Sequence, residues 1–234
     1  MKRLIFLLLL AGSTLLASAQ FTGKLVYEVT TSMNMNKLTM VCYLDKSHAR
    51  IEAVSVPLNA GVPDPTNPHY QDTLLFDLTT GKQTTMQYKT HMAVITSYTS
   101  MILMEAGLYK EGDVTVENMG AENVNGYNCT HFVLTMTKTK SKRDFWITKD
   151  LGAASLIVAG SYLYYPPGHP FLQKLIDAGG AGVMVKASTG ARGFLSTLNL
   201  VSVDKKMPAA TLFQVPSRYT TLDRSNMAIP QATQ

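Results

Sequence analysis

Apolar and polar side chains alternate along several stretches of this chain, and this period-two pattern constrains the fold more than any other feature. From Phe21 to Val29, for example, Leu25, Tyr27 and Val29 fall on one side of an extended backbone. The stretch from Leu38 to Leu44 repeats the alternation. Because successive side chains of a strand point to opposite faces, these stretches predict β-strands with one apolar face.

Short turn sequences separate the predicted strands. The alternating residues 74–78 run into Thr79-Thr80-Gly81-Lys82, after which the pattern resumes, and this arrangement indicates a β-hairpin. Connections this short join antiparallel neighbours, so we expect one antiparallel sheet. Further strands are expected within residues 114–118, 128–137, 141–148, 183–187 and 194–203.

The remaining segments predict a few short helices and covering loops. Helices are expected within residues 92–108 and over 171–178, and the four prolines of residues 57–71 predict a long loop. Residues 151–173 contain no formally charged side chain, but glycines and prolines interrupt the run well short of a transmembrane span. We interpret this run as a buried cover over the sheet, with a docking or membrane-touching loop as the alternative.

The N-terminus has the pattern of a secretory signal. Two basic residues precede an apolar run that ends in Ala17-Ser18-Ala19, a small-x-small cleavage site. We therefore expect residues 1–19 to be a signal peptide, 20–222 a single β domain and 223–234 a polar tail that frays after Tyr219. No cysteine follows the cleavage site to carry a lipid, so the mature chain is predicted to be periplasmic or secreted, without a transmembrane span.

Charge and motifs argue against nucleic-acid binding and give no support for an enzyme. The net charge of +5 falls to +3 when the two basic residues of the signal are removed, which is too low to indicate nucleic-acid binding. No nucleophile elbow, phosphate-binding loop or zinc-binding helix motif occurs, and the five histidines are dispersed. The sequence therefore predicts no catalytic residue, no metal site and no cofactor.

The two cysteines, Cys42 and Cys129, have two interpretations. In an oxidising compartment they are a candidate disulfide, which would close a long loop and stabilise the fold by roughly 4 to 5 kcal/mol. Alternatively, they are two small buried side chains on neighbouring strands.

A set of short motifs occurs in one order along nearly the whole mature chain. They are Gly23-Lys24-Leu25-Val26-Tyr27-Glu28, Arg50-Ile51-Glu52, Leu75-Phe76-Asp77 with Thr80-Gly81-Lys82, Gly126-Tyr127-Asn128-Cys129, Trp146-Ile147-Thr148-Lys149-Asp150-Leu151-Gly152, and Leu212-Phe213-Gln214-Val215-Pro216-Ser217-Arg218-Tyr219. In this order they resemble an uncharacterised secreted family common in Bacteroidota, with the fold of the lipoprotein carrier LolA. The resemblance implies a curved antiparallel half-barrel, mostly β with a few short helices over its concave face. It brings no catalytic residues.

This architecture leads to a functional hypothesis, a periplasmic or envelope binding protein for a lipid, acyl chain or other apolar ligand. The alternative is a non-enzymatic envelope module whose groove or sheet edge binds a protein partner by strand addition. The candidate ligand-binding residues are Leu25, Tyr27, Met40, Phe76, Met86 and Trp146 as lining, with Met101 and Met104 as cover.

Overall fold

The computed structural model describes residues 20–32, 36–59, 62–63, 66, 68–97, 114–154, 157–160, 163–165, 167–191 and 194–226. Strands dominate these residues. They are β1 (Gly23–Thr31), β2 (Asn36–Leu44), β3 (His48–Asn59), β4 (Val62–Pro63), β5 (His69–Tyr70), β6 (Thr73–Asp77), β7 (Lys82–Gln87), β8 (Met92–Ser97), β9 (Val114–Val124), β10 (Tyr127–Met136), β11 (Lys142–Thr148), β12 (Ile157–Gly160), β13 (Leu163–Tyr165), β14 (Val183–Ala191), β15 (Phe194–Asp204) and β16 (Thr220–Asp223), with helix α2 (Pro170–Asp177) and the 3-10 helix η1 (Ala210–Phe213).

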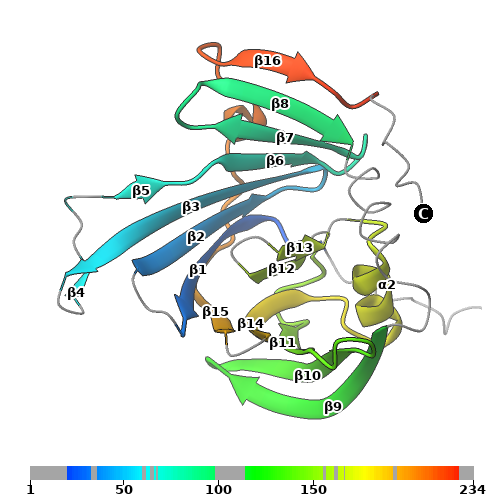
Figure 1. Ribbon diagram of the computed structural model, residues 1–234. Helices are drawn as coiled ribbons and strands as arrows, with labels where there is room; N and C mark the ends of the chain where they lie inside the picture. The colour runs from blue at the N-terminus through cyan, green and yellow to red at the C-terminus, as the bar shows by residue number, and fades with distance from the viewer. Residues whose placement is uncertain are drawn as a thin grey trace, which may run out of the picture.

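Fourteen of these strands form one sheet in the described part of the chain. Its order is β16-β8-β7-β6-β3-β2-β1-β15-β14-β11-β10-β9, with β4 and β5 paired to β3 beside this path. All of its strand pairs are antiparallel except β16 with β8, which is parallel. Figure 1 shows the sheet curving into an open, C-shaped half-barrel. The predicted mostly β, curved antiparallel architecture is confirmed.

The main core lies on the inner, concave face of this sheet. Alternation places Leu25, Tyr27 and Val29 of β1 on this face, where each is almost completely buried. Helix α2 lies in the opening of the C, as does the β12–β13 hairpin (Figure 1). The buried Phe171, Leu172 and Leu175 of α2 belong to the same hydrophobic cluster as the inner-face residues of β10, β11 and β14.

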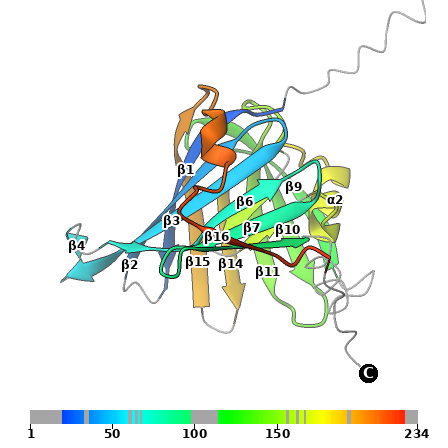
Figure 2. The same ribbon diagram turned by 90° about the horizontal axis from the view of Figure 1, so that it is seen from above.

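The outer face of β3 and β6–β8 is also covered, by the segment that follows β15. Figure 2 shows η1 beside β1 and β3 on this outer side. Arg50 on β3 donates from Nη1 to the Leu212 carbonyl over 2.8 Å and pairs with Glu52, while His48 stacks on Phe213 with ring centroids 5.5 Å apart. We call residues 207–219 the C-terminal strap.

Several sequence expectations change in the structure. Residues 92–97, expected in a helix, form strand β8, and the rest of that predicted helix lies outside the described residues. The chain after Tyr219 does not fray at once, because Thr220 to Asp223 pair in register with Met92 to Ile95. The expected loop at 57–71 contains the end of β3 and the short strands β4 and β5. The helix expected over 171–178 is confirmed as α2.

The glycine-rich segment after α2 is a close-packed turn. Gly179 has φ +95° and ends the helix, with its N–H donating to the Ile176 carbonyl over 2.8 Å. A Cβ on Gly182 would lie 2.3 Å from the Thr148 carbonyl oxygen, so only glycine lets the chain pass this close to β11.

Tyr27 links the two halves of the sheet. Its buried hydroxyl donates to the Met184 carbonyl on β14 over 3.0 Å. Burial, with a contribution from Cys42, raises the pKa of Tyr27 well above its ordinary value, so the hydroxyl stays a donor at working pH.

Replacing Tyr27 by phenylalanine should lower the free energy of unfolding by about 1–2 kcal/mol, because the Met184 carbonyl loses a buried donor. Urea titration followed by circular dichroism measures this change. The matched control is Tyr43→Phe on β2, where the tyrosine is only partly buried. Equal losses in both variants would contradict a special role for the Tyr27 hydroxyl.

Candidate functional site: the inner face and the open edge of β15

The inner face of the half-barrel is the first candidate site, and its wall is almost wholly apolar. Cross-strand register aligns Leu25 with Cys42 and Tyr27 with Met40, and Ala49 on β3 lies opposite Phe76 on β6. Because these residues are all buried, the alternation along each strand has produced one apolar wall across β1, β2, β3 and β6.

Four of the predicted lining residues lie on this wall: Leu25, Tyr27, Met40 and Phe76. Their contact with a ligand stays a prediction. The predicted cover residues Met101 and Met104 lie outside the described residues.

Met86 does not lie on the inner face, contrary to the prediction. It is opposite Thr73, which shares the outward side of β6 with Leu75. Met86 packs with Leu75 and Ala93 in a second hydrophobic cluster, against Val215 and Tyr219. The C-terminal strap therefore buries Met86 from outside.

Trp146 also points outward, contrary to the prediction. On β11 its side chain alternates with those of Phe145 and Ile147, although all three residues belong to the main hydrophobic cluster, and it lies on the same face as its cross-strand partner His131. The indole is only 9% exposed because His131 stacks on one side, with centroids 4.4 Å apart, and the Lys186 Nζ lies 4.4 Å from the ring centroid. Its Nε1 donates to Glu122 over 2.6 Å.

A polar group interrupts the inner face at β7 and β8. Gln83 lies opposite Phe76 on one side and Thr96 on the other, so it points inward with them. Its Nε2 donates to Thr85 Oγ1 over 3.3 Å. The sequence pattern does not reveal this inward amide, because a polar residue in an alternating strand is ordinarily assigned to the solvent side.

The second candidate site is a pocket at the edge of β15. This strand pairs with β14 from Phe194 to Asn199, after which β14 pairs with β11 alone. The segment Leu200–Asp204 still pairs with β1, but no strand in the described part of the chain pairs with its other edge. We call this segment the open edge of β15.

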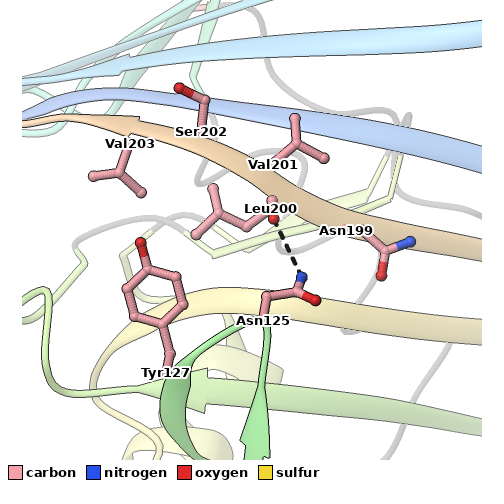
Figure 3. Close-up of a pocket in the computed structure, with 7 residues that line it drawn as sticks. All are labelled: Asn125, Tyr127, Asn199, Leu200, Val201, Ser202 and Val203. Atoms are coloured by element: carbon pink, nitrogen blue, oxygen red, sulfur yellow. Dashed lines mark hydrogen bonds between the residues drawn. The ribbon is translucent and has the colours of Figure 1, made fainter.

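The turn between β9 and β10 closes one side of the pocket (Figure 3). Asn125 and Gly126 both have positive φ, 53° and 83°, as the tightest hairpin turns require. The Asn125 Nδ2 donates to the Leu200 carbonyl over 3.3 Å. The pocket measures about 490 Å³, and its lining residues are Asn125, Tyr127, Asn199, Leu200, Val201, Ser202 and Val203.

Cys42 and Cys129 are both buried, and both are free thiols. Of the two interpretations of these cysteines, the structure therefore has the pair of buried side chains and not the disulfide. They are on β2 and β10, and four strands of the sheet lie between these two. Burial raises the pKa of Cys42 far above its ordinary value and that of Cys129 to about 11.

No cluster of three or more histidine, cysteine or acidic side chains suited to a metal occurs among the described residues. Within the same residues, no helix is both long and apolar enough to cross a membrane.

Comparison with known proteins identifies the family. The family model described as "Domain of unknown function (DUF4412)" matches residues 21–219. The chain belongs to this family. No curated protein matches the chain. The predicted membership in a family of unknown function is confirmed, and its predicted distribution in Bacteroidota stays an expectation.

Similar solved structures come from several bacteria. The lipoprotein LppX of Mycobacterium tuberculosis is 10% identical, with a TM-score of 0.36, covering 80% of this chain and 89% of that chain. LprF of Mycobacterium bovis is also 10% identical, with a TM-score of 0.33 and coverages of 85% and 90%. A putative outer membrane lipoprotein-sorting protein domain of Vibrio parahaemolyticus is 10% identical, with a TM-score of 0.23 and coverages of 81% and 89%.

The thiols give a direct test of the cysteine assignment. Native protein at pH 8 should not react with a thiol reagent, because both sulfurs are buried and protonated, whereas denatured protein should show two reactive thiols without a reductant. As pH rises toward 11, Cys129 should react first, because its pKa is the lower of the two. A denatured protein that needs reductant before it reacts would contain the disulfide.

Proposed function

We propose that this protein is a non-enzymatic binding protein of the periplasm or envelope, which shelters an acyl chain or another apolar ligand on its inner face. The apolar wall across β1, β2, β3 and β6 carries the proposal. In a two-sheet sandwich, an apolar wall of this kind packs on a second large sheet. Here the elements inside the C are, among the described residues, only the helix α2 and the β12–β13 hairpin. An apolar ligand that entered this space would remove its own apolar surface from water, which stabilises the complex by about 25 cal/mol per Å².

Other observations agree with a binding role. The sequence carries a predicted export signal and lacks the nucleophile-elbow, phosphate-loop and zinc-helix motifs. Apolar binding sites need few polar groups, and the inner wall has few.

Native mass spectrometry of the mature protein, purified from its own envelope under mild conditions, tests the proposal. A copurifying lipid at about one per chain, identified after organic extraction, is the expected result. Protein that arrives bare and also refuses added fatty acids and phospholipids would overturn it.

The two faces of the sheet provide a matched pair of variants. Phe76→Leu should weaken binding of a fluorescent fatty acid about 3- to 10-fold, because the side chain lies on the apolar wall. Met86→Leu, on the outer face under the C-terminal strap, should leave the affinity unchanged. Fluorescence titration measures both dissociation constants. Equal changes would show that the inner wall is not where the probe binds.

A second function, binding an extended peptide of a protein partner, is favoured by the open edge of β15. Strand addition uses unpaired backbone groups at a sheet edge, with nearby pockets for side chains. The open edge offers both, since no strand among the described residues pairs with the second edge of Leu200–Asp204, and a pocket of about 490 Å³ adjoins this segment. Val201 in this pocket is 52% exposed and gives an apolar contact for the peptide.

Site-specific crosslinking tests this second function. Ser202→Cys, labelled with a photoreactive maleimide, should capture a partner through one extended segment, and that peptide should protect the Leu200–Asp204 amides from hydrogen exchange. Labelling is selective because both native thiols are buried. Lys140→Cys, on the exposed turn between β10 and β11, is the control. The same crosslinks from both positions, or no exchange protection, would reject the edge as the docking site.

A further inference from the structure

Gln83 carries a buried atom without a partner. Gln83 lies on strand β7 and is only 6% exposed. Among the described residues, its Oε1 is the buried side-chain oxygen or nitrogen that no hydrogen bond satisfies. A buried carbonyl without a donor destabilises the folded state, so folded proteins rarely leave one unless a ligand or water completes it.

Exchanging the oxygen and nitrogen positions of the Gln83 amide still leaves one of its polar atoms without a partner. If the oxygen and nitrogen of Gln83 were exchanged, Thr85 Oγ1 would donate to the oxygen, and the amide N–H groups would then lack an acceptor. In either orientation one polar atom of the amide has no partner. A hydroxyl group satisfies both cases, because it donates and accepts.

The inward-facing residues beside Gln83 on β6 to β8 are uncharged. Its cross-strand partners are Phe76 and Thr96, and the adjacent inward positions on β6 to β8 are Leu74, Thr85 and Val94. A carboxylate or phosphate buried here would meet no cation from these strands, which makes an anionic group costly. A neutral polar group avoids this cost.

We propose that Gln83, Thr85 and Thr96 form a polar subsite that binds the hydroxyl group of a neutral amphiphile, whose apolar part lies along the inner wall. This inference rests on the proposed function and names its ligand class, a hydroxyl-bearing neutral lipid such as an acylglycerol. Thr96 donates to the Gln83 backbone carbonyl over a long 3.5 Å, so the hydroxyl of Thr96 is only weakly engaged. Thr85 already anchors the amide of Gln83.

The ligand class can be tested by measuring how well three palmitoyl compounds displace the neutral dye Nile red from the protein. Because the three compounds share one acyl chain, they differ only in their polar group. We expect monopalmitoylglycerol to bind about tenfold more tightly than methyl palmitate, which lacks the hydroxyl, and more tightly than ionised palmitate. One hydrogen bond to the free amide atom accounts for a tenfold ratio. Equal affinity of the glycerol ester and the methyl ester would overturn the subsite and leave the proposed function standing. Failure of every palmitoyl compound to bind would overturn both.

Gln83→Leu separates a ligand subsite from a structural role. Without ligand this variant should have a higher Tm, because the buried polar atom that lacks a partner is removed. Its affinity for monopalmitoylglycerol should fall to about that for methyl palmitate, so that the preference for the glycerol ester is lost. Thr85→Val should also reduce the preference, whereas Thr84→Val, facing outward on the same strand, should leave it unchanged. A lower Tm in Gln83→Leu, with the tenfold preference retained, would show that Gln83 serves the fold alone.

Discussion

The ladder between β1 and β15 joins segments near opposite ends of the domain, and the rest of the half-barrel depends on it. Along the sheet, β1 belongs to the half that continues through β2, β3 and β6, and β15 belongs to the half that continues through β14, β11 and β10. Tyr27 adds a bond to Met184, 157 positions later in the chain. The length-dependent part of closing such a loop costs about 4–5 kcal/mol. Burial of Tyr27 and Val29 against Leu198 and Leu200 offsets this cost, and it also creates the continuous inner wall.

A curved open sheet also has an outer face, and parts of this outer face are buried as well. This burial explains why the predicted inward positions of Met86 and Trp146 are wrong. Alternation reveals which residues share a side of a strand, but it does not reveal which side faces the core. Met86 was assigned inward because it is apolar, yet the C-terminal strap buries it from outside. Trp146 was assigned inward for the same reason, yet His131 and Lys186 cover it. The covering groups lie far from these residues in sequence, so no local pattern indicates them.

Features set by local rules were predictable. The hairpin around Thr80-Gly81-Lys82 follows from turn chemistry, and helix α2 follows from a short apolar run after Pro170. Features set by distant contacts were not. Strand β16 forms because Thr220 to Asp223 reach the free edge of β8, and its four residues have no strand pattern of their own. Two of the motifs that carry the family resemblance meet in such a distant contact, since Arg50 donates to the Leu212 carbonyl of the C-terminal strap.

The two candidate sites differ in the physical rule that each leaves unsatisfied. At Gln83 one polar atom of a buried side-chain amide lacks a partner, and at the open edge of β15 no strand in the described part of the chain pairs with the second edge of Leu200–Asp204. Foldable sequences tend to satisfy such rules everywhere except where function requires otherwise. The exception at β15 is solvent-accessible, so water satisfies its backbone while no partner is bound. The exception at Gln83 is buried, where water has less access, and leaving it unsatisfied destabilises the ligand-free protein. That difference makes the inner face the stronger candidate for a ligand whose binding stabilises the fold.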